Sequence, residues 1–130
     1  MTTVIRLLSV LLAAPVLLVW LSLANEVIAA DAGHGAKVFN EECAECHSAA
    51  PGRNKKGPTL FAVVGRVAGG VPDYAYSDAM KASGVTWSPD KLDAYIAAPH
   101  KLVPGCKMKY DGLGDAAARA DLIAYLANTH

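Results

Sequence analysis

The pattern Cys43-Ala44-Glu45-Cys46-His47 constrains the fold of this 130-residue chain more than any other part of its sequence. On a helical turn, residues three and four apart lie on the same face, so Cys43 shares a face with both Cys46 and His47. The third cysteine, Cys106, lies far along the chain, and three cysteines cannot all pair within one chain. The cysteines therefore need an explanation other than a disulfide framework.

C-x-x-C-H is the attachment sequence for c-type haem. Two thiols on one face can form thioethers with the vinyl groups of a haem edge, while the adjacent imidazole reaches the iron. Zinc binding and thioredoxin-like redox chemistry are the alternatives for a C-x-x-C pair. Zinc needs four ligands, and only Cys106 and scattered histidines remain; the βαβ pattern of thioredoxin-like proteins is absent from the sequence. We therefore predict one covalently bound haem c, attached through Cys43 and Cys46, with His47 as an iron ligand.

A haem with one histidine either takes a second axial ligand or keeps an open site, and this choice separates electron carriers from enzymes. Met108 is the first candidate: it lies 61 residues after His47 and follows the turn signal Pro104-Gly105, so the chain can reach the other face of the haem. His100 is the second candidate. A thioether ligand is soft, favours ferrous iron and raises the reduction potential.

The first thirty residues predict a segment for export. Arg6 precedes a charge-free apolar run over residues 7–24, and the small residues Ala29-Ala30-Asp31-Ala32 follow it. This arrangement predicts a signal peptide over residues 1–30 and a mature domain over residues 31–130. An uncleaved membrane anchor is the alternative, because 18 apolar residues are barely enough to span a bilayer. Both interpretations place residues 31–130 in the periplasm, free in the first case and anchored to the outer face of the inner membrane in the second.

Residues 31–130 are poor in large aliphatic side chains. Leu, Ile, Val and Phe together number 17 in these 100 residues, below the level of about 20% at which a chain has difficulty building a core. A haem would supply the missing apolar centre, so we expect the chain without haem to be largely unfolded. The 12 basic and 12 acidic residues of the whole chain give no net charge, which excludes a strongly basic nucleic-acid-binding protein.

The strand signal is poor throughout, and the sequence predicts an all-α domain with a large share of loop. We expect helices over residues 33–45, 77–84, 88–98 and 115–128, with a glycine- and proline-rich loop over residues 48–73. In the last helix, Asp115 and Arg119 have the spacing of an i,i+4 ion pair.

The C-x-x-C-H motif, the Pro104-Gly105-x-Lys107-Met108 segment and Gly84-x-x-Trp87 between them closely resemble class I cytochrome c over nearly all of residues 33–130. The resemblance implies the class I fold, in which short helices and long loops surround one haem. It also implies that His47 is the proximal and Met108 the distal iron ligand.

Other cofactor-binding residues follow from the resemblance alone. Pro58 matches the proline whose carbonyl accepts a hydrogen bond from the proximal imidazole. Arg66, Tyr76 and Trp87 match residues that enclose the haem propionates, and Tyr95 matches a tyrosine beside the methionine sulfur.

Four residues depart from the class I pattern. Cys106 stands where threonine is usual, and its thiol is a weaker hydrogen-bond donor near the propionate and a second potential iron ligand. Met80 replaces an interior asparagine near Tyr95. Glu42 stands where a docking lysine is common, and Tyr110 replaces a phenylalanine at the haem edge.

By the resemblance, the protein is a monomeric one-electron carrier without catalytic residues. Its implied partners are a membrane-bound quinol:cytochrome c oxidoreductase of the bc type and a terminal oxidase or photosynthetic reaction centre. The alternatives are an anchored electron-transfer subunit and, with less support, a haem peroxidase. We expect transient electrostatic docking through lysines that flank the haem edge in the resemblance. These lysines are Lys55, Lys56, Lys101, Lys107 and Lys109.

Overall fold

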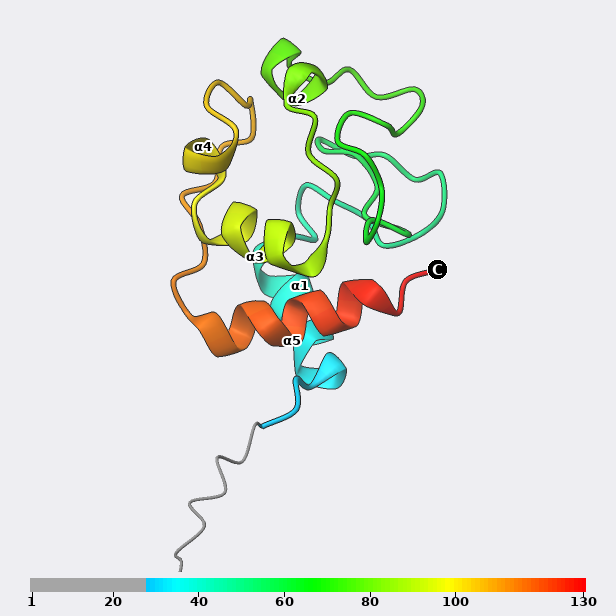
Figure 1. Ribbon diagram of the computed structural model, residues 1–130. Helices are drawn as coiled ribbons and strands as arrows, with labels where there is room; N and C mark the ends of the chain where they lie inside the picture. Colours follow the sequence, from blue (N-terminus) through cyan, green and yellow to red (C-terminus); the bar gives the residue numbers. More distant parts are fainter. Residues whose placement is uncertain (1–27) are drawn as a thin grey trace, which may run out of the picture.

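The computed structural model describes residues 28–130, which form a helical domain with long connecting loops (Figure 1). Its helices are α1 (Ala32–Glu42), α2 (Asp78–Ala82), α3 (Pro89–Ala97), α4 (Pro99–Leu102) and α5 (Ala116–Ala127). In this part of the chain no β-strand forms, and an isolated antiparallel bridge pairs Val67 with Thr86. The all-α prediction is confirmed. The predicted export segment, apart from its last three residues, lies outside the described residues.

The two terminal helices cross and pack against each other, with α1 behind α5 in the view of Figure 1. Gly35 lies at the crossing, where a Cβ atom would stand 2.0 Å from the backbone oxygen of Asp121. One turn further along α1, the ring of Phe39 packs against Tyr125 with centroids 5.4 Å apart. The close approach of the two backbones therefore requires glycine at residue 35.

Asp121 also binds the start of α1. Its Oδ1 accepts a hydrogen bond from the backbone N–H of Asp31 at 2.7 Å, and its Oδ2 lies 2.7 Å from Nδ1 of His34. The side chain of Asp31 in turn accepts from the backbone N–H groups of Gly33 and His34, as an N-cap does. The beginning of the domain is thus fixed to the middle of α5 by polar contacts.

A small apolar core lies between the helices. It includes buried side chains from α1, α3, α5 and the connecting segments: Val38, Phe39, Leu92, Tyr95, Leu122, Ile123, Leu126, Met80, Trp87 and Cys106. Met80 occupies the position where the resemblance expects asparagine, so an apolar side chain is buried there.

Serine side chains begin the two central helices. Ser77 Oγ accepts from the N–H of Met80, and Ser88 Oγ accepts from the N–H of Lys91. The expected helix after Ser88 ends before Pro99, but a further short helix, α4, begins at this proline and was not predicted. Proline lacks an N–H and has a fixed φ, which makes it acceptable in the first turn of a helix.

The predicted ion pair within the last helix is wrong. Asp115 is instead the N-cap of α5, and its carboxylate accepts from two backbone N–H groups of the first turn. Arg119 Nε donates to Asp93 Oδ1 at 2.7 Å, and its Nη1 donates to the carbonyl of Leu113 at 2.8 Å. Arg119 therefore joins α5 to α3 rather than to its own first turn.

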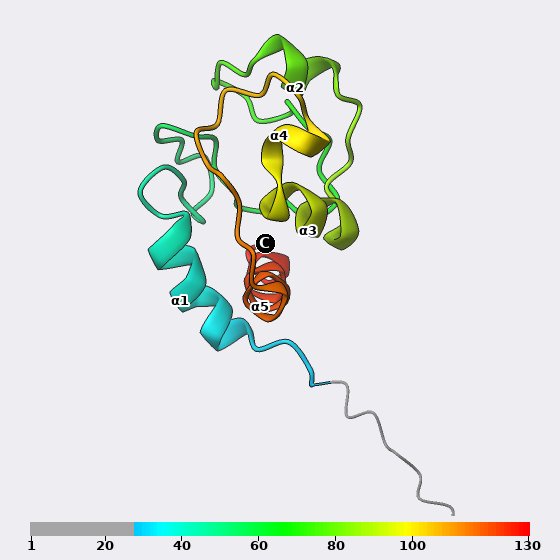
Figure 2. The ribbon, with the colours of Figure 1, turned by 90° about the vertical axis from the view of Figure 1, so that its left-hand side faces the viewer.

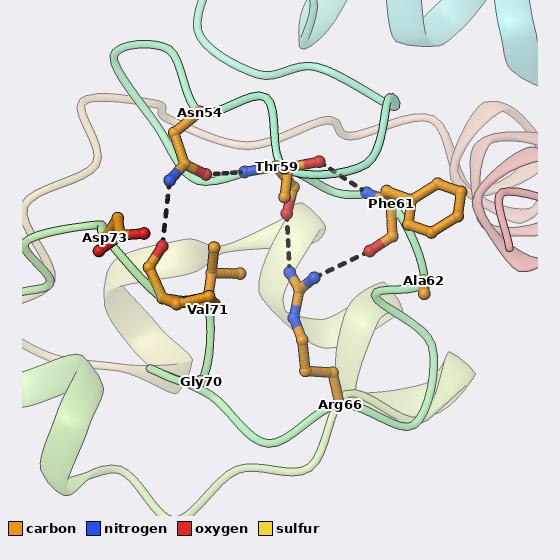
Figure 3. A pocket seen from close by; sticks show the side chains of 10 residues that line it. Asn54, Thr59, Phe61, Ala62, Arg66, Gly70, Val71 and Asp73 are labelled. Atoms are coloured by element: carbon orange, nitrogen blue, oxygen red, sulfur yellow. Dashed lines mark hydrogen bonds between the residues drawn. The ribbon is translucent and has the colours of Figure 1, made fainter.

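Side-chain hydrogen bonds help to hold the long loop between α1 and α2 (Figure 3). Asn54 Oδ1 accepts from the N–H of Thr59 at 2.9 Å, while its Nδ2 donates to the carbonyl of Pro72 at 3.2 Å. The guanidinium of Arg66 donates to the carbonyls of Thr59 and Phe61, both at 2.9 Å. These groups line a cavity of about 330 Å³.

Among residues 28–130, no helix is both long enough and apolar enough to cross a membrane. The apolar run over residues 7–24 lies outside this range.

Candidate haem site

The cysteine motif lies on the turn that follows α1. Backbone N–H groups of both Cys46 and His47 donate to the carbonyl of Cys43, at 3.0 and 2.9 Å. This turn gathers Cys43, Cys46 and His47 at the end of the helix. Both cysteines are free thiols and half-buried. Burial and the neighbouring Glu42 raise the pKa of Cys43 to about 11, so its free thiol stays protonated at neutral pH.

The imidazole of His47 is held in a defined orientation. Its Nδ1 lies 2.8 Å from the carbonyl oxygen of Pro58, which accepts the N–H and leaves the lone pair on Nε2. Burial lowers the pKa of His47, so the neutral form that binds metals is favoured. Gly57 lies against the ring, because a Cβ atom there would stand 2.3 Å from Cε1.

Met108 lies in the segment between α4 and α5, beside Tyr95 of α3. The Tyr95 hydroxyl is 4.0 Å from Met108 Sδ, and the Tyr95 ring packs against Trp87 with centroids 4.9 Å apart. Burial, followed by the neighbouring Cys106, raises the pKa of Tyr95, so the hydroxyl remains a donor. Tyr95 and Trp87 are thus brought together with the predicted distal ligand.

His100 and Cys106, the alternative ligand candidates, lie close to each other. Cys106 is 7% exposed, and its Sγ is 3.5 Å from Nδ1 of His100. The sequence did not predict this contact.

The predicted propionate neighbours lie on two loops: Arg66 and Tyr76 between α1 and α2, and Trp87 between α2 and α3. The backbone N–H of Trp87 donates to the carbonyl of Arg66 at 2.9 Å, so these two residues are adjacent. The Tyr76 hydroxyl accepts from the N–H of Val71 at 3.2 Å. Their contact with propionates stays a prediction.

The donor set fits a c-type haem. It combines two free thiols on one turn, a neutral imidazole with Nε2 available, and a thioether next to a tyrosine hydroxyl. Within residues 28–130, no group of three or more His, Cys, Asp or Glu side chains is arranged to hold a metal ion.

Comparison with known proteins decides the family. The family model for cytochrome c matches residues 32–130. The chain belongs to the cytochrome c family. It is a class I cytochrome c with one covalently bound haem c, an electron-transfer protein and not an enzyme.

Cytochromes from several organisms are similar to this one. It is 50% identical over 96 residues to cytochrome c2 of Rhodopila globiformis. The matched region covers 74% of this chain and 91% of that relative. Cytochrome c of Theileria annulata is 48% identical over 97 residues, with 74% and 84% of the two chains covered. The solved structure of cytochrome cH from Methylobacterium extorquens has a TM-score of 0.69 and 46% identity, and the match covers 74% of this cytochrome and 96% of that chain.

Proposed function

We propose that this cytochrome c is a monomeric, periplasmic one-electron carrier between a bc-type quinol:cytochrome c oxidoreductase and a terminal oxidase or photosynthetic reaction centre. The arrangement of Met108 beside the Tyr95 hydroxyl, together with the oriented His47, carries this proposal. Two protein ligands close the iron to substrates, which favours electron transfer over peroxidase chemistry. The similarity to bacterial cytochromes c2 and cH supports the periplasmic location.

His47 Nε2 and Met108 Sδ are the proposed axial ligands, and Cys43 and Cys46 the thioether attachments. When bound, the haem supplies a one-electron Fe(III)/Fe(II) couple. Pro58 orients the imidazole and makes it more basic through the Nδ1 hydrogen bond. We further propose that Arg66, Tyr76 and Trp87 bind or enclose the propionates.

An absorption spectrum and a redox titration test the ligand set. The oxidised protein is expected to show the far-red sulfur-to-iron band and a positive midpoint potential, and modest cyanide should not remove the band. Met108→Ala should abolish the band and give a high-spin spectrum, whereas the matched variant His100→Ala should keep it. A clearly negative midpoint, or a high-spin wild-type protein, would contradict the carrier and favour the peroxidase alternative.

Two lysines are best placed for electrostatic docking. Lys56 pairs with Glu45 at 2.6 Å, Lys55 donates to the carbonyl of Ala44, and Lys107 donates to the carbonyl of Ala75. Lys101 and Lys109 are exposed, and their side chains form no ion pair or hydrogen bond within the described residues.

Salt dependence and charge reversal test this docking surface. Turnover with a partner oxidase should fall as salt rises. Lys101→Glu and Lys109→Glu should slow turnover at low salt more than Lys37→Glu, which lies on α1. An unchanged turnover across salt concentrations would contradict docking through these charges.

Export with cleavage before Asp31 is the proposed maturation. The Asp31 side chain caps α1 and its N–H binds Asp121, so a mature chain that starts at Asp31 keeps both contacts. N-terminal sequencing should return Asp31 first; a chain that begins at Met1 or Thr2 would instead support the anchored subunit.

A further inference from the structure

The segment that carries Met108 is held mainly by side chains. It is fixed at both ends by backbone hydrogen bonds, from Cys106 N–H to the carbonyl of Val103 at 3.1 Å and from Leu113 N–H to the carbonyl of Ile96 at 2.9 Å. Between these ends, residues 107–112 form no backbone–backbone hydrogen bond with any described residue. Figure 2 shows this segment as the orange coil that leads down to α5 without a helix.

One side-chain hydrogen bond joins this segment to α1. The hydroxyl of Tyr110 donates to Oε2 of Glu42 at 2.7 Å, across 68 residues of sequence. Tyr110 follows Met108 by two residues, and Glu42 directly precedes Cys43. The bond therefore connects the proposed distal ligand to the turn that attaches the haem.

The two partners of this bond are both departures from the class I pattern described above. A lysine and a phenylalanine at residues 42 and 110 could not form it, because phenylalanine has no hydroxyl and lysine has no acceptor. The hydrogen bond between Glu42 and Tyr110 therefore gives one explanation for both departures from the class I pattern.

We propose that Glu42 and Tyr110 are positioning residues that keep Met108 on the iron. This inference rests on the proposed ligation by Met108. An external ligand can bind the iron only after Met108 leaves, which requires residues 107–112 to move away from the haem. The Glu42–Tyr110 hydrogen bond opposes that movement, since its donor is in the segment and its acceptor is on the end of α1. Glu42 is exposed, so the contribution is modest.

Imidazole binding to the oxidised, haem-loaded protein measures how readily residues 107–112 carry Met108 away from the iron. The rate of loss of the far-red band at saturating imidazole reports how often Met108 leaves. Tyr110→Phe and Glu42→Ala, which remove the donor and the acceptor, should each raise this rate about three- to tenfold, and the double variant should match the single ones. Glu41→Ala makes the same substitution one residue away and should leave the rate unchanged.

Three outcomes of the rate measurement would overturn the proposal. These are unchanged rates in both single variants, an equal increase in Glu41→Ala, and effects that simply add in the double variant. A lower unfolding midpoint with an unchanged imidazole rate would also show a purely structural role. Absence of the far-red band from the wild-type protein would overturn Met108 ligation itself, whereas its presence with unchanged rates overturns only the role of Glu42 and Tyr110.

Discussion

Gly57 lies directly against the imidazole of His47: a Cβ atom on residue 57 would stand 2.3 Å from Cε1 and 2.7 Å from Nδ1. The ring cannot turn away without breaking its hydrogen bond to Pro58. We therefore expect Gly57→Ala to destabilise the haem-loaded protein by about 2–3 kcal/mol, as overpacking in a fixed site does. Thermal unfolding measures this. Gly114→Ala is the matched control, because no atom lies within 4 Å of its added Cβ; equal unfolding of the two variants would disprove the steric argument.

The crossing of α1 and α5 is expected to tolerate no side chain at Gly35. An added Cβ would meet the backbone oxygen of Asp121 at 2.0 Å, so the helices must separate. Gly35→Ala should cost about 3 kcal/mol in urea unfolding despite the better helix propensity of alanine. Lys37→Ala, on the exposed side of the same helix, should change stability by less than about 0.5 kcal/mol. A wild-type urea midpoint for Gly35→Ala would show that the helices separate without cost.

Asp121 is expected to make the free energy of unfolding depend on pH. Hydrogen bonds from Asp31 and His34 lower the pKa of Asp121 in the folded protein below its value in the unfolded chain. Its contribution is therefore complete above the unfolded pKa of about 3.9 and is lost as the pH falls through the folded value. Asp121→Asn should be less stable than the wild type at about pH 6, and the difference should shrink below about pH 4. Denaturant unfolding at a series of pH values checks this, and a difference that stays constant with pH would contradict it.

Haem attachment is expected to be necessary for folding. The described core is small, and residues 31–130 contain only 17 Leu, Ile, Val and Phe. The Cys43→Ala, Cys46→Ala chain without haem should therefore show no cooperative unfolding transition and little helix by circular dichroism. The haem-loaded wild type is the reference. A cooperative transition in the variant would show that the polypeptide alone forms the domain.

Local signals in the sequence predicted most of the helices. Ser77, Ser88 and Asp115 each begin a helix as expected, because an N-cap acts on backbone groups within three residues. The short helix α4 was missed because a proline is a local signal for the end of a helix. That Pro99 also begins a new helix depends on the fold of the chain around it.

Contacts between distant residues could not be read from spacing. Arg119 has an acidic neighbour at i−4, yet its side chain reaches Asp93 on another helix, while Asp115 is occupied as a cap. The cysteine motif was recognisable because both haem-attaching cysteines and the histidine lie within five consecutive residues, 43–47. The Glu42–Tyr110 hydrogen bond had no such signal, since its partners are 68 residues apart.

Asn54 closes the long loop between α1 and α2 with both atoms of a neutral amide, by accepting from Thr59 and donating to Pro72. An amide carries no charge that changes with acidity. The two hydrogen bonds of Asn54 therefore do not depend on the protonation of the side chain that forms them. A change in acidity that weakens the α1 and α5 contact at Asp121 therefore does not act directly on the Asn54 hydrogen bonds.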